Sequence, residues 1–411
     1  MKQFDQVCVV GLGYIGLPTA AVLASRKIRV LGVDIEQSVV DTINNGEVHI
    51  IEPDLDMVVN ATVTQGFLRA STKPEAADAF LIAVPTPFKQ DHEPDLAFIE
   101  SASRAIAPVL KPGDLVILES TSPVGTTEQM ANWLSEERAD LRFPHTHPDN
   151  ADINIAHCPE RVLPGHVLIE LIQNDRVIGG ITTQCSNAAM ELYKTFVEAE
   201  MLVTNARTAE MCKLVENSFR DVNIAFANEL SVICDKSDIN VWELIKLANH
   251  HPRVNILQPG TGVGGHCIAV DPWFIVSQAK QDARLIHTAR LVNDFKPSFV
   301  ANKICEMAKT LGTNKVSCLG LAFKPDIDDL RESPALEVVR ILATREIDLT
   351  LVEPNIDVLP AEFAVNRLAP LNQVLCDDNQ LIAILVAHRS FKDAKMSLMD
   401  RKVLDFCGAL T

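Results

Sequence analysis

Long apolar runs are missing from this sequence, and so are paired cysteines. No stretch approaches the roughly 18 consecutive apolar residues that a membrane-spanning helix needs, so we expect no membrane insertion. The chain opens with MKQFDQVCVVGLG, which enters a strand directly, and this favours the absence of a targeting segment. None of the 10 cysteines belongs to a CxxC pair. We therefore expect reduced thiols, no metal site and a cytoplasmic protein.

Basic residues are scarce relative to acidic ones. The chain has 37 lysines and arginines against 54 aspartates and glutamates, which gives a formal net charge of -17. Such a charge opposes long-range attraction to nucleic acid or to an anionic membrane surface. We therefore expect no nucleic-acid partner, and an anionic small ligand would need local basic residues.

The 411 residues, of which 47% are hydrophobic, suffice for two or three domains. Short apolar runs such as QVCVVGLG, IRVLGVDI and AFLIAVPTP alternate with amphipathic stretches, as in parallel βαβ units. From Asn205 a periodic segment of about 35 residues predicts one long helix or two abutting ones. Strand-like runs resume at KVSCLGLAFK, and no repeat of 20 to 50 residues is visible. We predict an α/β fold with domains at 1–204, 205–309 and 310–411.

The run GLGYIG follows the first apolar strand. Gly11 permits the tight turn, Gly13 lets the backbone approach a pyrophosphate, and Gly16 allows close helix–strand packing. The phosphate would sit on the N-terminus of the following helix. Asp34 ends the second strand, where its carboxylate would accept from ribose hydroxyls and repel a 2′-phosphate. The run therefore predicts dinucleotide binding in a Rossmann domain, with NAD favoured over NADP.

Four other residues are candidates for the cofactor site. Tyr14 and Ile15 lie in the glycine turn, where they either contact the nucleotide or only pack. Thr86 and Thr121 follow two later strands, where ligands collect in open α/β sheets. Each threonine could instead be a turn residue.

Cys267 lies in the glycine-laden run GTGVGGHCIAVD. A free cysteine is most often a small buried hydrophobe. In an enzyme that carries an aldehyde to an acid, however, a thiolate adds to the aldehyde and makes it oxidisable. Lys213, Asn217 and Arg220 are spaced four and three apart, so on a helix they share one face. That face is either anion-facing or simply solvated.

Five segments together resemble the nucleotide-sugar 6-dehydrogenases, the UDP-glucose/GDP-mannose dehydrogenase family. They are GLGYIGLPTA, HCPERVLPG, TAEMCKLVENSFRDVNIAFANEL, NHHPRVNILQPGTGVGGHCIAVDPWF and GLAFKPDIDDLRESP. The resemblance covers almost the whole chain. It implies an N-terminal Rossmann domain, a central long-helix dimerisation domain and a C-terminal Rossmann-like UDP-binding domain.

The resemblance also implies a four-electron oxidation of a sugar C6 alcohol to the acid, with two NAD reduced per substrate. Cys267 is then the nucleophile that carries a thiohemiacetal and a thioester. Lys213 is the acid/base or oxyanion-stabilising residue and Asn217 is its partner. Asp271 helps the water that cleaves the thioester.

Two further positions match the family's water-activating and site-lining residues. Glu160 in CPERV corresponds to the acid that activates the water, and Thr121 corresponds to a hydroxyl that lines the site. The alternatives are a solvated strand-end acid for Glu160 and a turn hydroxyl for Thr121.

A UDP-sugar carries a diphosphate, and arginine forks bind phosphate oxygens well. The residues matched to substrate binding are Arg161, Val162, Lys213, Asn217, Arg220, His251, Arg253, Gly264, Phe323 and Lys324. Arg331 is matched to cofactor binding. The family resemblance assigns Arg253 to the site of the neighbouring subunit in a homodimer built around the long helix. For the apolar face of that helix the alternative is a monomeric core.

Pro164 stands where glucose-oxidising relatives carry a second acid, which disfavours UDP-glucose and favours an N-acetylhexosamine. The extended match favours UDP-N-acetyl-D-mannosamine, and UDP-N-acetylglucosamine stays open because C2 stereochemistry does not follow from the residues. The product would serve cell-envelope polysaccharide synthesis. Cys407 stands where relatives commonly have a basic residue.

Two other classes of protein share part of this pattern. A two-electron 3-hydroxyacid-type dehydrogenase would need neither Cys267 nor a third domain. A non-catalytic NAD-binding scaffold would need neither Lys213 nor Asn217 in matching contexts. Both are disfavoured.

Overall fold

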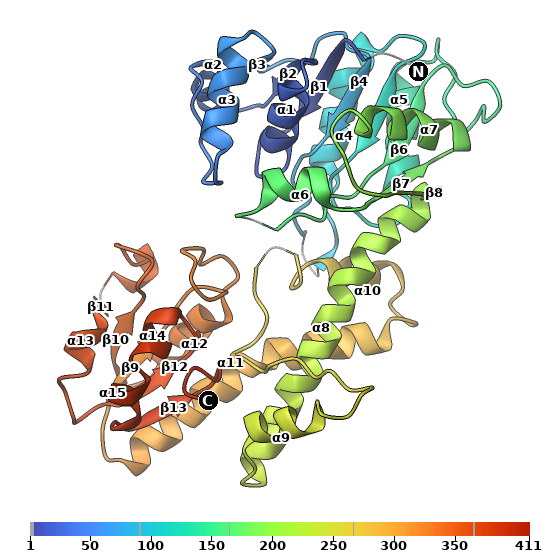
Figure 1. Ribbon diagram of the computed structural model, residues 1–411. Helices are drawn as coiled ribbons and strands as arrows, with labels where there is room; N and C mark the ends of the chain where they lie inside the picture. The colour runs from blue at the N-terminus through green and yellow to red at the C-terminus, as the bar shows by residue number, and fades with distance from the viewer. Residues whose placement is uncertain (1–3, 90–91, 164, 266, 365) are drawn as a thin grey trace. The chain divides into compact units, whose positions relative to one another are not determined.

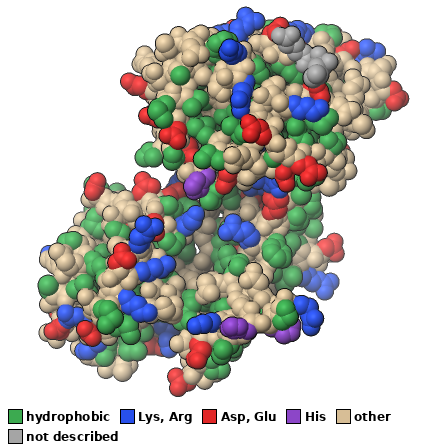
Figure 2. Space-filling view, in the orientation of Figure 1, with side chains coloured by type: hydrophobic (Ala, Val, Ile, Leu, Met, Phe, Trp, Pro, Cys, Tyr) green, Lys and Arg blue, Asp and Glu red, His purple; other side chains and the backbone are tan. Residues whose placement is uncertain are grey.

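The computed structural model describes residues 4–89, 92–163, 165–265, 267–364 and 366–411 (Figure 1). The chain forms two compact units, a first that ends at Val215 and a second from Glu216 to Thr411. No described helix is long and apolar enough to cross a membrane. Acidic and basic side chains are interspersed on the face shown in Figure 2, without a continuous basic region there.

The first unit is built on an eight-stranded sheet with the order β3-β2-β1-β4-β5-β6-β7-β8. Its strands are β1 (Gln6–Val10), β2 (Arg29–Val33), β3 (Leu68–Ser71), β4 (Ala79–Ile82), β5 (Leu115–Leu118), β6 (Asn154–His157), β7 (Arg176–Gly180) and β8 (Met201–Asn205). All neighbours are parallel except β6 and β7, which are antiparallel. The chain leaves β1 on one side for β2 and later returns to its other side as β4, which creates a crevice at the carboxyl ends of these strands.

Helices cover both faces of this sheet because its strands are apolar on both sides. Val7 and Val9 of β1 belong to one core, and Cys8 and Val10 belong to the other. The first core takes α1 (Gly16–Ser25), α2 (Gln37–Asn44), α3 (Leu55–Thr64), α6 (Val167–Gln173) and α7 (Thr183–Tyr193). The second core takes α4 (Ala97–Ile106) and α5 (Thr126–Glu137).

The periodic segment after Asn205 forms one unbroken helix, α8 (Ala206–Lys236), of 31 residues. The first of the two predicted arrangements, one long helix, is therefore correct. The second unit continues with α9 (Val241–Ala248), α10 (Asp271–Gln278) and the 27-residue α11 (Arg284–Thr310).

A buried polar network joins α8 to α11. Arg290 Nη1 donates to Asp221 Oδ1 at 2.6 Å, and Asn293 Nδ2 donates to the same oxygen at 2.8 Å. Asn228 donates to Asn293 at 2.9 Å and accepts from the backbone N–H of Gly260 at 2.9 Å. Because Gly260 begins the glycine-rich loop, the network also fixes the start of that loop.

A five-stranded parallel sheet with the order β11-β10-β9-β12-β13 completes the second unit. Its strands are β9 (Lys315–Leu319), β10 (Asp348–Val352), β11 (Arg367–Leu368), β12 (Leu381–Ile384) and β13 (Val403–Asp405). One face packs on α11 and α12 (Pro334–Ala343). The other packs on α13 (Leu371–Val374), α14 (Arg389–Asp393) and α15 (Lys395–Met399). The predicted α/β class with two Rossmann-like sheets is confirmed, whereas the domain boundaries at 204/205 and 309/310 stay predictions.

The two sheets begin in the same way. Gly11 and Gly320 both have a φ of 92°, and each donates its N–H at 2.8 Å to the last residue of the second strand. The next residue of each turn donates to the carboxylate that follows that strand, at 3.0 Å to Asp34 and at 2.7 Å to Glu353. The sequence shows no short repeat, yet both sheets contain the same arrangement of a glycine turn after one strand and a carboxylate after its neighbour.

Candidate active site

Close backbone packing shapes the glycine turn after β1. A Cβ on Gly11 would lie 2.6 Å from the carbonyl oxygen of Ala83, and a Cβ on Gly16 would lie 1.8 Å from the carbonyl oxygen of Gly11. Both positions require glycine because a side chain would collide with backbone atoms. Around Gly13, by contrast, a Cβ would meet nothing within 4 Å. The open position is the one at which the sequence predicts a pyrophosphate.

Asp34 fastens this turn from the end of β2. Its carboxylate accepts from the backbone N–H of Leu12 at 3.0 Å and of Glu36 at 3.1 Å. Each carboxylate oxygen keeps a second lone pair, with which Asp34 can accept from the hydroxyls of an adenosine ribose. The next residues are Ile35, Glu36 and Gln37, so no arginine directly follows Asp34 to bind a 2′-phosphate.

The turn leads into the N-terminus of α1. Unpaired N–H groups of a first helical turn attract anions, and the first turn of α1 contains no acidic residue. Tyr14, 41% exposed, and the half-buried Ile15 precede it. The glycine turn, the carboxylate of Asp34 and this helix terminus together fit a dinucleotide.

Thr86 and Thr121 follow β4 and β5 at the carboxyl edge of the same sheet, and both are half-buried. The Ser120 hydroxyl donates to the carbonyl oxygen of Val84 at 2.8 Å, which ties the two loops together. This placement agrees with a role at the edge of the dinucleotide site, which stays a prediction for both threonines.

The turn after β6 carries Glu160, Arg161 and Val162. Glu160 is 8% exposed, so it is not a solvated strand-end acid. Its Oε1 accepts from the backbone N–H of Arg161 at 2.8 Å, and its Oε2 lies 2.9 Å from Nη1 of Arg176. The guanidinium of Arg161 donates to the carbonyl oxygen of Asp175. Val162 packs against the first core.

Two buried charged residues lie near Glu160 and were not predicted from the sequence. Arg176 is 4% exposed and Glu119 is 2% exposed. The Tyr193 hydroxyl donates to Glu119 Oε1 at 2.7 Å. Burial raises the pKa of Glu119 to about 7 although Arg176 attracts its charge, and Glu160 adds repulsion. The sequence signal for their burial was one charged residue directly at an apolar strand: Glu119 in LVILES and Arg176 in RVIGG.

Lys213, Asn217 and Arg220 stand on α8 at the predicted spacing. Lys213 is half-buried, Asn217 is 8% exposed and Arg220 is exposed. In one unbroken helix this spacing puts them on one face. The beginning of α8 is anchored by Glu210, whose buried carboxylate accepts from the backbone N–H of Thr127 at 2.7 Å.

Asn217, Asp271 and the Cys267 loop form a chain of contacts within the second unit. Asn217 Nδ2 donates to Asp271 Oδ2 at 2.6 Å, and Asp271 is 3% exposed. The backbone N–H of Asp271, the first residue of α10, donates to the carbonyl oxygen of Cys267 at 2.8 Å. Cys267 itself is exposed. A buried amide–carboxylate pair therefore holds the loop that presents an accessible thiol.

The glycine-rich segment ahead of Cys267 packs against a later loop of the same unit. A Cβ on Gly264 would lie 2.3 Å from the carbonyl oxygen of Glu332 and 3.0 Å from Cβ of Phe323. A Cβ on Gly265, whose φ is +82°, would lie 2.8 Å from the Phe323 ring. Gly264 and Phe323, both predicted to bind substrate, are thus neighbours.

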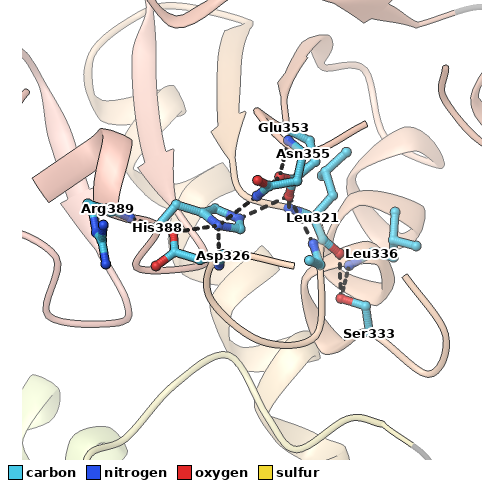
Figure 3. A network of polar contacts seen from close by, with 9 residues as sticks. Leu321, Asp326, Ser333, Leu336, Glu353, Asn355, His388 and Arg389 are labelled. Carbon is cyan, nitrogen blue, oxygen red and sulfur yellow. Dashed lines mark hydrogen bonds and ion pairs between the residues drawn. The ribbon is translucent and has the colours of Figure 1, made fainter. Parts of the chain in front are cut away.

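A buried histidine holds the loop that carries Lys324 and Arg331 (Figure 3). His388 is 0% exposed and its Nδ1 accepts from the backbone N–H of Asp326 at 2.9 Å. Nε2 must then carry the proton, and it lies 3.0 Å from Glu353 Oε2. Asp326 has a φ of +62°, a left-handed conformation that is uncommon outside glycine. The histidine fixes this turn of the loop.

The basic residues predicted to grip the diphosphate are mostly exposed. Lys324, His251 and Arg253 are all exposed, and the backbone N–H of Arg253 donates to His251 Nδ1 at 3.3 Å. Arg331 is exposed as well, and its guanidinium pairs with Asp329 at 2.8 Å. The side chains of Arg331, Arg161 and His251 thus also contact neighbouring protein groups.

Cys407 does not replace the missing basic residue. Its thiol lies 3.5 Å from Asp405 Oδ1, and burial raises its pKa well above the ordinary value. Pro164, on which the preference for an N-acetylhexosamine depends, lies outside the described residues. Among the residues with described positions, no group of three or more His, Cys, Asp or Glu could hold a metal ion.

Three family models match successive parts of the chain. They describe the NAD binding domain (residues 5–197), the central domain (207–295) and the UDP binding domain (317–410) of the UDP-glucose/GDP-mannose dehydrogenase family.

Named relatives match over nearly their whole lengths. A UDP-N-acetyl-D-mannosamine dehydrogenase of Campylobacter jejuni is 63% identical and covers 99% of this chain and 100% of its own. An NDP-N-acetyl-D-galactosaminuronic acid dehydrogenase of Ralstonia nicotianae is 60% identical, with 99% and 96% covered. The solved structure of a UDP-D-ManNAc dehydrogenase from Pyrococcus horikoshii superposes with a TM-score of 0.88 at 38% identity, covering 99% and 96%. The chain therefore belongs to the UDP-glucose/GDP-mannose dehydrogenase family and is an NAD-dependent oxidoreductase.

Proposed function

We propose that this protein oxidises UDP-N-acetyl-D-mannosamine at C6 to UDP-N-acetyl-D-mannosaminuronate through a thioester on Cys267. The observation that carries the proposal is the line of contacts from Asn217 through Asp271 to the loop of an exposed Cys267. A dehydrogenase that stops at the carbonyl needs no such thiol. The mannosamine substrate is supported by the 63% identical relative from C. jejuni.

The first oxidation converts the C6 alcohol to an aldehyde. NAD, when bound, accepts the electron pair that leaves C6 in each of the two oxidations. Lys213 stabilises negative charge on the C6 oxygen, and Asn217 donates a hydrogen bond at the same site. Because Asn217 is also held by Asp271, its amide is fixed before substrate arrives.

The thiol supplies the second half of the reaction. The Cys267 thiolate adds to the aldehyde carbon to give a thiohemiacetal, whose oxidation leaves a thioester. Water then attacks the acyl carbon, and the C–S bond breaks to release the carboxylate and restore the thiol. Glu160 and Asp271 assist this water, and Thr121 lines the site. In sum, one alcohol, two NAD and one water give one carboxylate, two NADH and three protons.

Basic side chains supply the contacts to the diphosphate. Arg161, Arg220, His251 and Lys324 are the residues assigned to the sugar nucleotide, with Val162, Gly264 and Phe323 lining the same site, and Arg331 is assigned to the cofactor. Arginine and lysine side chains bind phosphate oxygens through charge-assisted hydrogen bonds. An excess of acidic residues in the whole chain does not oppose this, since short-range pairing decides affinity at a site.

We also propose a homodimer in which Arg253 reaches the neighbouring subunit's site. Phe219, Phe226 and Ile233 are 70%, 51% and 51% exposed and recur every seven residues on α8. Seven residues are close to two helical turns, so the three side chains form one apolar stripe. A second copy of the same stripe is the partner that buries it.

Three other assignments stay proposals. The division into 1–204, 205–309 and 310–411 agrees in outline with the three family domains. A cytoplasmic location is supported by the cysteines, all of which are free thiols. A role in supplying precursors for cell-envelope polysaccharides follows from the uronic acid product.

A substrate panel tests the proposal directly. The enzyme is incubated with NAD and limiting UDP-N-acetyl-D-mannosamine, UDP-N-acetylglucosamine, UDP-N-acetylgalactosamine or UDP-glucose, and NADH per sugar and product mass are measured. We expect two NADH and a carboxylate, with kcat/KM highest for the mannosamine by about tenfold or more. One NADH with an aldehyde product would refute the thioester route. A preference for UDP-glucose would refute the substrate assignment, and a preference for the galactosamine would instead favour the activity named for the R. nicotianae relative.

A further inference from the structure

Arg176 owes its position to the reversed strand of the first sheet. Strand β7 pairs antiparallel to β6, with Ala156 opposite Gly180 and His157 opposite Gly179. When this register is extended by three residues beyond the His157–Gly179 pair, Arg176 lies opposite Glu160. A parallel β7 would carry Arg176 to the other end of β6. The antiparallel pairing thus delivers a cation to the turn that holds the water-activating acid.

The contacts of Arg176 leave it little freedom. Its Nη1 lies 2.9 Å from Glu160 Oε2, and its Nη2 donates to the carbonyl oxygen of Leu171 at 3.3 Å. The guanidinium stacks over Tyr193, 4.9 Å from the ring centroid, and over Phe196, at 5.6 Å. The side chain is 4% exposed. A cation so enclosed cannot reach a sugar nucleotide in solvent.

The carboxylate of Glu160 is held at both oxygens. Arg176 holds Oε2, and the backbone N–H of Arg161 holds Oε1 at 2.8 Å. The two contacts fix the orientation of the carboxylate. Oε2 is buried, whereas Oε1 keeps a second lone pair that can accept from a water. Without the cation, the nearly buried Glu160 carboxylate would lose its counter-ion and would turn away from this position.

We propose that Arg176 is a positioning residue for thioester hydrolysis, holding the Glu160 carboxylate in the orientation from which it assists the water. This inference rests on the proposed function, because it assumes the acyl group on Cys267. It concerns the last step only. The two oxidations depend on Lys213 and Cys267 and do not require the Glu160–Arg176 pair.

The test separates oxidation from hydrolysis. Arg176→Met, Arg176→Lys, Glu160→Gln and wild type are mixed with NAD and UDP-N-acetyl-D-mannosamine. The NADH burst is followed in stopped flow, and acid-quenched chains are weighed by mass spectrometry. For Arg176→Met we expect a burst near two NADH per site, acyl-enzyme on most chains and hydrolysis slower by about tenfold or more. Arg176→Lys keeps the charge, so its hydrolysis should be intermediate.

The double variant guards against a merely structural effect. If Arg176 acts through Glu160, then Arg176→Met should add no further slowing in a Glu160→Gln background. The double variant also removes both partners of the Glu160–Arg176 ion pair, so it remains informative where Arg176→Met fails to fold. Arg138→Met, which removes a partly buried arginine hydrogen-bonded to Leu110, is the control and should not accumulate acyl-enzyme.

Three results would overturn the inference. One is an equal fall in burst and steady-state rates for Arg176→Met, and another is additive slowing in the double variant. The third is wild-type hydrolysis by Arg176→Met while Glu160→Gln accumulates acyl-enzyme. If no variant, Glu160→Gln included, shows any adduct on Cys267 and one NADH forms per sugar, the proposed function itself fails.

Discussion

Among single residues, Cys267 combines an exposed thiol with a backbone that is fixed. Its carbonyl oxygen accepts from the N–H groups of Val270 (3.1 Å) and Asp271 (2.8 Å), which bind it to the first turn of α10. The glycine-rich loop before it is held by its packing on Phe323. A nucleophile must be accessible and yet stay in place, and this loop supplies both conditions.

Cys267→Ser should bind NAD as wild type does and form almost no acid. A serine hydroxyl is not ionised near neutral pH and adds to the aldehyde far less readily than a thiolate does. We expect acid formation to fall by about 10³-fold or more. Product is measured by mass spectrometry and NAD binding by calorimetry. Cys376→Ser, which alters another exposed thiol, is the control and should leave both unchanged.

Glu119→Gln should stabilise the protein at high pH. Burial raises the pKa of Glu119 from 4.5 to about 7, so between these values the folded protein holds a proton that the unfolded chain releases. Folded stability therefore falls as pH rises from 4.5 to 7. Glutamine removes the charge and can still accept from Tyr193. We expect a gain of up to about 3 kcal/mol at pH 8 and less than about 1 kcal/mol at pH 5.

Urea unfolding at the two pH values measures this gain. The control is Glu128→Gln, which removes a partly exposed partner of Arg207 and should change stability by about 1 kcal/mol or less at both pH values. A gain of the same size at pH 5 and pH 8 would show that the charge of Glu119 is not its source.

At the level of elements, α8 and α11 are joined by buried charged and polar side chains. Asp221→Asn should lower the free energy of unfolding by about 3 kcal/mol, because Arg290 would lose its fully buried counter-ion and keep only the more exposed Asp294. Asp235→Asn breaks the half-exposed pair with Lys303 on the same two helices. That control should cost about 1 kcal/mol or less in the same denaturation experiment.

The sequence predicted the elements that carry their own periodicity or turn chemistry. The length of α8 follows from the apolar spacing after Asn205. The glycine turn after β1 follows from Gly11, Gly16 and Asp34. Reversed pairing of β7 with β6 could not be predicted, since strand direction is set by distant packing and leaves no local signal. The burial of Glu160 against Arg176 was missed for the same reason.

For the molecule as a whole, the apolar stripe of α8 predicts the state of assembly. Phe226→Asp should convert the proposed dimer to monomer, because a charge would be desolvated at the centre of the stripe. Light scattering coupled to size exclusion measures the mass. Val358→Asp alters a side chain that is 78% exposed and lies outside α8, and it should leave the mass unchanged. A wild-type chain of 45.1 kDa in solution would refute the dimer.

The carboxylates that follow the second strand of each turn, Asp34 and Glu353, differ in how many further hydrogen bonds they can accept. Glu353 accepts from five donors, which are the N–H groups of Leu321, Ala322 and Asn355, the side-chain amide of Asn355 and His388. A carboxylate offers about four lone-pair sites, so Glu353 is saturated by its own protein whereas Asp34 is not. Glu353 therefore has no lone pair left for a ribose diol, whereas Asp34 can still accept from one. An adenosine ribose would therefore meet no open carboxylate acceptor at this turn, which favours NAD binding at the first sheet over the second.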